Sequence, residues 1–168
     1  MPSLSPALPV SLIDETIVRA MDHVFRTMIQ HQITFLEKTE PHSALAGTEP
    51  EVLGSVGFIG AANGLIYLRF PEPYAILATS RILGMTLAET EMNGPEVVKD
   101  AMGEITNMAV GGFKNTLCDL GYPCKLTLPT IVRGQRITVA SVKETTRHVF
   151  HFRCEGHRIV ADLQLKVD

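Results

Sequence analysis

Apolar positions in the first third of the chain follow helical spacing and then give way to a polar stretch. Over residues 12–35 they recur at helical intervals, with two acidic residues in the first turn, so a helix is predicted. Residues 1–11 contain three prolines and no charge, and we expect a flexible leader there. Residues 37–51 are polar, contain two prolines and predict a loop.

The next segments have strand and then helix patterns. Residues 52–60 and 65–70 are short apolar runs, joined by a sequence whose Asn63-Gly64 pair strongly favours a hairpin turn. Both faces of these strands are apolar, which places them in the centre of a sheet. Residues 72–83 then predict a second helix.

A long helix is predicted from Pro95 to about Gly121. Gly94 is a candidate cap, Pro95 suits the first helical position, and Glu96 lies in the first turn. Gly121 followed by Pro123 ends the helix. This helix is the longest element that the sequence predicts.

Strands follow the long helix one after another. The last alternates apolar and polar residues, as a strand with one solvent-exposed face does, and Glu155-Gly156 supplies the turn before it. An N-terminal helix, a β-hairpin, two helices and then a run of strands indicate an α+β fold with a largely antiparallel sheet, in a single domain over residues 12–168. The expected strands are residues 125–128, 137–142, 147–153 and 158–166.

The long helix has an unusual distribution of polar residues in "VVKDAMGEITNMAVGGFKN", residues 97–115. A surface helix normally has a broad polar face, whereas this one is apolar nearly all round. At about 100° per residue, its polar and glycine positions fall within one narrow strip. Glu104 and Asn107 are neighbours at its centre, and Gly111, one turn further on, would let another surface come close. The strip comprises Asp100, Gly103, Glu104, Asn107, Gly111 and Lys114.

The pattern alone leaves two interpretations of this strip open. It is either the ordinary polar side of an amphipathic helix, with Gly111-Gly112 serving tight packing, or a functional site. In a site, the carboxylate of Glu104 can pair with a cation, and the carboxamide of Asn107 can accept from water and donate to a phosphoryl oxygen. Orienting water is a protein's main task in hydrolysing a phosphoryl group.

Charge and cysteine content narrow the function classes. A formal net charge of −3, without a long block of one sign, argues against nucleic acid or an anionic membrane as a partner. The three cysteines include no CxxC pair, which is typical of the reducing cytosol, and Cys118 and Cys124 are expected to be buried rather than reactive. The longest uncharged run, 17 residues between Glu51 and Arg69, is too short and too polar for a membrane span.

Two other features suggest sites but have simpler explanations. His148, Cys154 and His157 lie near the last hairpin, but their spacing matches no standard zinc motif, so no metal site is predicted. Residues 57–64 are glycine-rich like a phosphate-binding loop. They lack GKS, GxGxxG and a following helix, so a hairpin is the better interpretation.

Several segments resemble the CheX/CheC/FliY family of chemotaxis phosphatases, which remove phosphate from the aspartyl phosphate of CheY-type response regulators. "DAMGEITNM" is similar to the signature helix of the family, whose pattern is Asp or Ser, then xxxExxN, and a later proline. Here Asp100, Glu104, Asn107 and Pro129 hold these places. "HVFRTM", "GLIYLRF" and "LGYPCKLTLPTIVRG" resemble other segments of the CheX branch. That branch has one such helix where CheC-type members usually have two.

This resemblance implies a mechanism. In the family, the signature helix enters the active site of the regulator. Carried over, Asn107 orients the attacking water and Glu104 pairs with the active-site lysine of the regulator. The partner supplies Mg²⁺ and the acylphosphate, so this chain is expected to bind no cofactor or metal of its own. The remaining strip residues are expected to contact the partner: Asp100, Gly103, Gly111 and Lys114. Asp100 and Lys114 would form the solvated rim of that contact.

The resemblance also implies a homodimer that associates through its sheets, as CheX-type members do, and the cysteine content predicts a cytoplasmic location. Strands that are apolar on both faces would otherwise leave hydrophobic edges exposed. A non-catalytic alternative stays open, because a module or scaffold that only binds a response regulator needs the same helix. The presence of both Glu104 and Asn107 favours the phosphatase.

Overall fold

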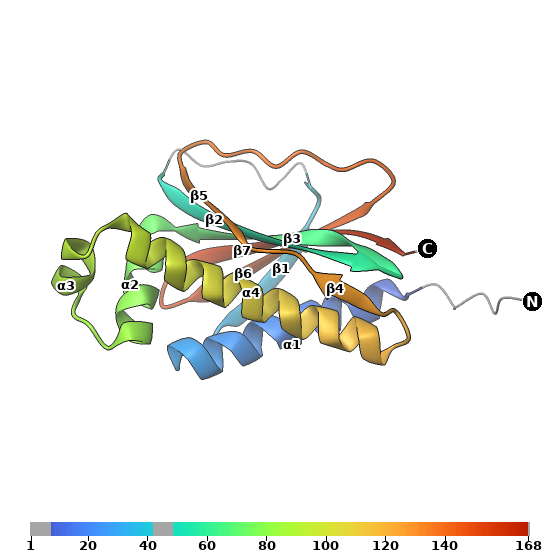
Figure 1. Cartoon of the computed structure of the whole chain (residues 1–168), viewed down its shortest axis with the longest axis horizontal. Helices are drawn as coiled ribbons and strands as arrows, with labels where there is room; N and C mark the ends of the chain where they lie inside the picture. Colours follow the sequence, from blue (N-terminus) through green and yellow to red (C-terminus); the bar gives the residue numbers. More distant parts are fainter. Residues whose placement is uncertain (1–7, 42–48, 168) are drawn as a thin grey trace, which may run out of the picture.

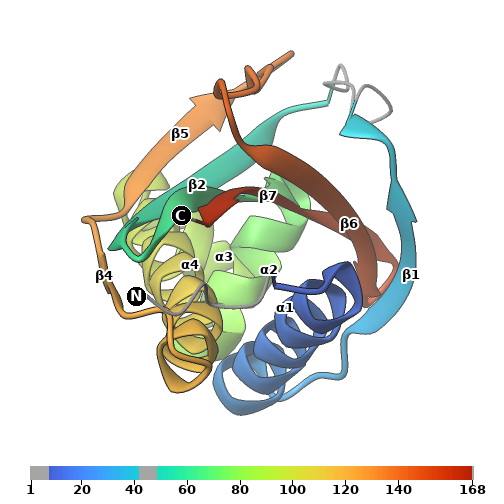
Figure 2. The same ribbon diagram turned by 90° about the vertical axis from the view of Figure 1, so that its right-hand side faces the viewer.

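An antiparallel sheet with helices on one face forms the frame of the molecule (Figures 1 and 2). A computed structural model describes residues 8–41 and 49–167, and within these residues seven strands form one sheet. Their order is β1-β6-β7-β3-β2-β4, and β5 also pairs with β2. The strands are β1 (Thr34–Thr39), β2 (Glu51–Gly60), β3 (Ala62–Pro71), β4 (Cys124–Leu126), β5 (Thr130–Gly134), β6 (Thr146–Cys154) and β7 (His157–Val167).

The helices pack against the inner face of this sheet, and the connection between β5 and β6 crosses the outer face (Figure 1). Apolar side chains from the helices and from strands β2, β3, β6 and β7 form the core between the two layers. The helices are α1 (Val10–Val24), continued by the π-helical turn η1 (Phe25–Ile29), α2 (Glu72–Leu83), the short α3 (Leu87–Met92) and α4 (Pro95–Asp119).

The predicted α+β class with a largely antiparallel sheet is confirmed, as are the two later helices. α2 covers residues 72–83, and α4 begins at Pro95 after Gly94, as predicted. The two apolar strands of the hairpin, β2 and β3, lie within the sheet between β7 on one side and β4 and β5 on the other. These two apolar strands therefore lie inside the sheet, as their composition predicts.

The N-terminal helix differs from the prediction at both ends. It begins at Val10, inside the expected leader, whose residues 1–7 lie outside the described part of the chain. It ends at Ile29 instead of continuing to residue 35, because Gln30 takes a left-handed conformation with φ 61°. The chain then turns into the edge strand β1, which replaces the start of the predicted loop over residues 37–51. Residues 42–48 of that loop are not described.

The turn of the central hairpin lies earlier than predicted. Asn63 and Gly64 belong to β3, where they pair with Lys166 and Leu165. The Asn63 side chain instead binds the backbone N–H and C=O of Gly60, at 3.1 and 2.9 Å. Gly64 is required by close strand packing, since a Cβ there would lie 2.1 Å from the carbonyl oxygen of Gln164.

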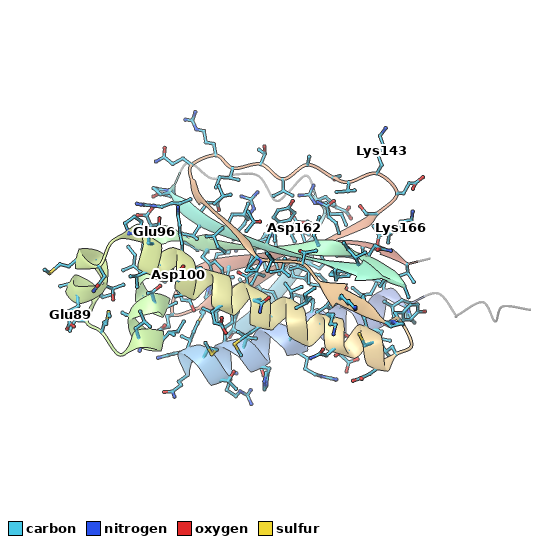
Figure 3. All side chains as sticks on the ribbon, in the orientation of Figure 1. Glu89, Glu96, Asp100, Lys143, Asp162 and Lys166 are labelled. Carbon is cyan, nitrogen blue, oxygen red and sulfur yellow. The ribbon has the colours of Figure 1, made fainter. Side chains whose placement is uncertain are left out.

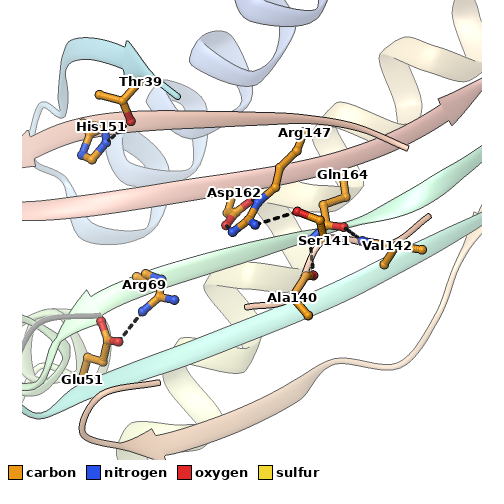
Figure 4. A network of polar contacts seen from close by, with 10 residues as sticks. All are labelled: Thr39, Glu51, Arg69, Ala140, Ser141, Val142, Arg147, His151, Asp162 and Gln164. Carbon is orange, nitrogen blue, oxygen red and sulfur yellow. Dashed lines mark hydrogen bonds and ion pairs between the residues drawn. The ribbon is translucent and has the colours of Figure 1, made fainter. Parts of the chain in front are cut away.

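The prediction of a strand over residues 137–142 is wrong. The strand in this region is β5, and residues 135–145 cross the outer face of the sheet without regular structure. This segment, which we call the strap, is held by Gln164 of β7. The Gln164 amide accepts from the Val142 N–H at 2.6 Å and donates to the Ala140 carbonyl at 3.0 Å (Figure 4).

The middle of the outer face of β7 is buried, although the sequence predicts a half-exposed strand. Asp162 and Gln164 are both 0% exposed beneath the strap. Arg147 binds both carboxylate oxygens of Asp162, at 2.9 and 2.6 Å, and its remaining arm donates to Ser141 of the strap at 3.0 Å. We call Arg147, Asp162 and Gln164 the outer-face network. Polar residues are buried here because each has a partner.

Candidate functional site

Helix α4 packs closely against β2, with Thr106 of the helix facing Gly54 of the strand. Thr106 is fully buried, and its hydroxyl donates to the Met102 carbonyl at 2.7 Å. A Cβ at Gly54 would lie 2.2 Å from the Thr106 oxygen, so only glycine fits at this place in β2. Glycine inside an apolar strand is a sequence signal for such a close approach, but β2 contains Gly54, Gly57 and Gly60, and the sequence alone does not single out Gly54.

Gly112 lies where α4 packs against α1. A Cβ at Gly112 would lie 3.5 Å from the Cβ of Ala20, in ordinary contact distance. An alanine would fit at this position, so the packing against α1 does not require Gly112. With β2 on one side and α1 on another, α4 is fixed in position along its length.

Three side chains of the predicted strip remain free. Asp100 and Glu104 are exposed and Asn107 is half-buried; Figure 3 locates Asp100 in the N-terminal part of α4. Within residues 8–41 and 49–167, no hydrogen bond or ion pair joins these three side chains to another group. Their polar atoms are therefore available for hydrogen bonds with solvent or with a partner.

The two strip glycines face this chain's own strands. Gly103 is buried, and a Cβ there would lie 3.5 Å from Cγ1 of Ile131 in β5. Gly111 is half-buried, with Cδ1 of Leu126 in β4 at 3.7 Å from the same constructed position. The surface beside Gly111 is therefore β4 of this chain, at a distance that an alanine would also allow. The sequence did not indicate that β4 and β5 would cover these positions.

The lysine at the end of the strip lies apart from its acidic members. Lys114 is half-buried, and its ammonium group donates to the side-chain oxygen of Asn115 at 3.5 Å. Asp100 and Glu104 are thus exposed carboxylates without a described cation beside them. The accessible centre of the strip is acidic, and it can accept a cationic group from a partner.

The chemistry available at this centre is that of one carboxylate and one carboxamide on adjacent turns. Glu104 and Asn107 are three positions apart, so their side chains leave the helix on the same face. The carboxylate accepts hydrogen bonds and carries charge. The amide of Asn107 accepts and donates at once, so it can hold a water molecule in a defined orientation.

Other parts of the molecule offer weaker candidates. His148 is buried and bonded to Thr146 at 3.0 Å, while His157 packs against Tyr74 at the far end of β6 and β7. His157 is paired with Cys154 across the turn between β6 and β7, whereas His148 lies toward the opposite end of β6, so the three side chains are not brought together. Among the residues that the structure describes, no group of three or more His, Cys, Asp or Glu could hold a metal ion.

The two cysteines at the end of α4 also lie in packed surroundings. Cys124 is buried, as predicted, and burial raises the pKa of its thiol. Cys118 is half-buried, and its thiol points at the Cys124 carbonyl at 3.7 Å. A thiol with a raised pKa is a poor nucleophile at neutral pH.

A cavity of about 280 Å³ opens at the start of α4, away from the strip. Its rim carries Arg133, which pairs with Glu72 at 2.5 Å, and apolar side chains such as Val52 and Val98 line its walls. None of the strip residues contributes to it. In the described chain, moreover, no helix is both long and apolar enough to cross a membrane.

Comparison with known proteins relates the chain to chemotaxis proteins. The family model described as chemotaxis phosphatase CheX matches residues 52–153, more than half of the chain. The fold is similar to that of chemotaxis protein CheX from Vibrio vulnificus, with a TM-score of 0.78, 23% identity and coverage of 92% of this chain and 99% of that one. CheX from Desulfovibrio desulfuricans gives a TM-score of 0.74 at 22% identity, covering 92% and 99%. The CheX–CheY–BeF3–Mg2+ complex from Borrelia burgdorferi gives 0.72 at 20% identity, covering 92% and 97%. No curated protein matches the chain in sequence.

Proposed function

The chain belongs to the CheX family of chemotaxis phosphatases, and on that basis we propose that it hydrolyses the aspartyl phosphate of a phosphorylated CheY-type response regulator. The observation that carries the proposal is the pair Glu104 and Asn107. Both project from a helix fixed against the sheet, and neither side chain has a partner among the described residues. The matched family region contains both residues.

In the proposed reaction, Asn107 does the chemical positioning. Its carboxamide accepts a hydrogen bond from water and holds that water in line with the phosphorus. Attack of the water forms a new P–O bond and breaks the bond to the aspartyl oxygen, which leaves as a carboxylate. The products are inorganic phosphate and the unphosphorylated regulator.

Glu104 anchors the helix in the partner. Its exposed carboxylate pairs with the active-site lysine of the regulator, which keeps Asn107 at a fixed distance from the phosphoryl group. Mg²⁺ belongs to the regulator in this scheme and neutralises phosphoryl oxygens there. The chain contributes no cofactor, and Asp100 and Lys114 form the rim of the contact.

Two further properties belong to the same proposal. The protein acts in the cytoplasm as a homodimer, in which apolar sheet edges cover one another. Light scattering at micromolar concentration should give about twice the 18.4 kDa of one chain. Affinity for a receiver should also rise when an acylphosphate analogue and Mg²⁺ are added.

Phosphate release from a phosphorylated CheY-type receiver, with and without this chain, tests the proposal. Wild type should accelerate release, Asn107→Ala should not, and Asn115→Ala is the matched control, since Asn115 is an exposed asparagine two turns further along α4. Binding without acceleration would identify the alternative function, a non-catalytic regulator-binding module or scaffold. Absence of both would contradict the proposal.

A further inference from the structure

The pairing of β2 with its outer neighbours is interrupted beside the strip. β4 pairs with β2 as far as Leu126 opposite Phe58, and β5 pairs from Thr130 opposite Ser55. Residues 127–129 therefore stand against only two residues of β2. One extra residue on one strand is a β-bulge, a feature that is frequent next to functional sites because it re-aims a side chain.

The bulge is held firmly on both sides. The Thr127 N–H donates to the Gly57 carbonyl at 2.8 Å, and the Gly57 N–H donates back to the Thr127 hydroxyl at 2.9 Å. Pro129 has no N–H and so interrupts the pairing without leaving an unpaired donor. Leu126 and Ile131, at either end, pack into the core.

These anchors place the bulge beside Asn107. Ile131 lies over Gly103 and Leu126 lies over Gly111, and each of these glycines is four residues, about one turn, from Asn107. The segment between Ile131 and Leu126 therefore passes alongside Asn107. Figure 1 shows the orange β4–β5 region running along α4.

The bulge exposes an apolar side chain at this place. Leu128 is 88% exposed, although the residues on either side of the bulge are packed. A partner that brings a phosphoryl group to Asn107 must approach α4 over this same surface. It cannot reach Asn107 without also meeting the bulge.

We propose that Leu128 is a second contact of this chain on the phosphorylated receiver, one that supplies affinity while Glu104 and Asn107 supply charge pairing and chemistry. The inference rests on the proposed function. An apolar contact beside a polar centre excludes water from it, which strengthens the charge pair made by Glu104.

Kinetics of receiver dephosphorylation separate this role from catalysis. Leu128→Ala should raise KM about five- to tenfold, the effect of truncating a leucine that becomes buried on binding, and should leave kcat within about twofold because Asn107 is intact. Leu128→Asp should raise KM further, since a charge is then desolvated in the contact with the receiver. Met92→Ala is the matched control, because Met92 is 87% exposed on α3 and lies outside the strip and the bulge.

Direct binding gives a readout that does not need turnover. The Kd for a beryllofluoride-activated CheY-type receiver should rise with the two Leu128 variants and not with Met92→Ala. If the Leu128 variants match wild type in KM and Kd while Asn107→Ala is inactive, the inference fails and the proposed function stands. If Leu128→Asp changes only the mass in light scattering, the side chain contacts a second copy, which also overturns the inference. A wild-type chain that neither binds nor dephosphorylates the receiver defeats the proposed function itself.

Discussion

The strip on α4 and the outer-face network are both polar, but they use their polar groups in opposite ways. In the network, both carboxylate oxygens of Asp162 and both ends of the Gln164 amide are bonded to other residues. In the strip, Glu104 and Asn107 have no such partner among the described residues. The polar groups of the outer-face network are bonded within the chain, and those of Glu104 and Asn107 are available to a second molecule.

The difference has an energetic meaning. A buried charge is tolerated only when it is paired. Here the hydrogen bond to Asp162 raises the pKa of Arg147, because it favours the charged guanidinium. The strip residues contribute little to folding, because their polar atoms are hydrated in the folded and unfolded states alike. Substitutions in the outer-face network should therefore lower stability, whereas substitutions in the strip should lower activity.

The largest effect is expected in the network. Asp162→Ala leaves Arg147 without its charge partner under the strap, and this should lower the free energy of unfolding by about 3–5 kcal/mol. Asp100→Ala is the matched control, because Asp100 is an exposed aspartate outside any described ion pair, and it should change stability by less than about 0.5 kcal/mol. Urea unfolding of both variants measures the difference. Equal stabilities would mean that the buried pair contributes nothing beyond a surface residue.

The next effect is on activity alone. Asn107→Ala should lower the dephosphorylation rate by about 10²–10³-fold, or roughly 3–4 kcal/mol, as expected when one group positioned for the transition state is lost. Its unfolding free energy should stay within about 0.5 kcal/mol of wild type, since a half-buried helix position without side-chain hydrogen bonds accepts alanine. Turnover at the wild-type rate would show that the mechanism assigned to Asn107 is wrong.

Glu104 should affect binding more than chemistry. Glu104→Ala removes the charge that pairs with the receiver lysine, and we expect a loss of about 2 kcal/mol in binding to an activated receiver. Glu104→Lys should bind more weakly still, because it sets like charges against each other. Glu96→Ala is the control, since Glu96 is an exposed glutamate on the same helix, whose ion pair within the described chain is with Lys99 at 3.6 Å. An unchanged Kd for Glu104→Lys would exclude the proposed ion pair.

The contact between Gly54 of β2 and Thr106 of α4 should affect both stability and activity. Gly54→Ala forces a methyl group against Thr106, so it should destabilise the fold by about 1–3 kcal/mol and lower activity by shifting the strip. Adding Thr106→Ala removes the oxygen at 2.2 Å and leaves the nearest contacts above 3 Å, so the double variant should recover much of both. Unfolding and turnover measured on the two variants test this coupling. If the second substitution rescued neither stability nor turnover, Thr106 would not determine the distance between α4 and β2.

The sequence predicts those features that depend on neighbouring residues. Both ends of α4 carry local signals in Gly94, Pro95 and Gly121, and its polar strip follows from helical geometry alone. The buried strands β2 and β3 are recognisable from their composition. These elements locate Glu104 and Asn107 without knowledge of the rest of the fold.

Features that depend on distant segments were missed. Asp162 and Gln164 look like an exposed strand face until the strap covers them, and nothing within β7 indicates that covering. Gly103 looks like an open position in the strip until Ile131 packs over it. β1 was missed because the helical pattern continues past Gln30, where the backbone turns left-handed. In each case tertiary contacts override the local pattern.

The smallest effect concerns a buried polar residue that lacks a charge partner of the kind Asp162 has. His148 is buried on β6, and burial lowers the pKa of its imidazole, with Lys38 acting in the same direction and Asp14 opposing it. A histidine whose pKa is lower in the folded state binds a proton more readily when the chain unfolds. Its contribution to stability is therefore fully present above the unfolded pKa of about 6.5 and is lost as the pH falls below that value. Burial lowers the pKa of His151 as well, so both histidines act in this direction.

We therefore expect the free energy of unfolding to decrease between pH 7.5 and pH 5.5, and His148→Leu to flatten that decrease in part. The flattening should be incomplete, because His151 still resists protonation, held between Thr39 at 2.8 Å and Arg158 at 3.1 Å. His23→Leu, at an exposed position on α1, should keep the wild-type slope. Urea unfolding at several pH values measures all three slopes. A His148→Leu slope as steep as that of wild type would show that the buried imidazole is protonated in the folded protein, and that burial without a charge partner does not suppress its charge.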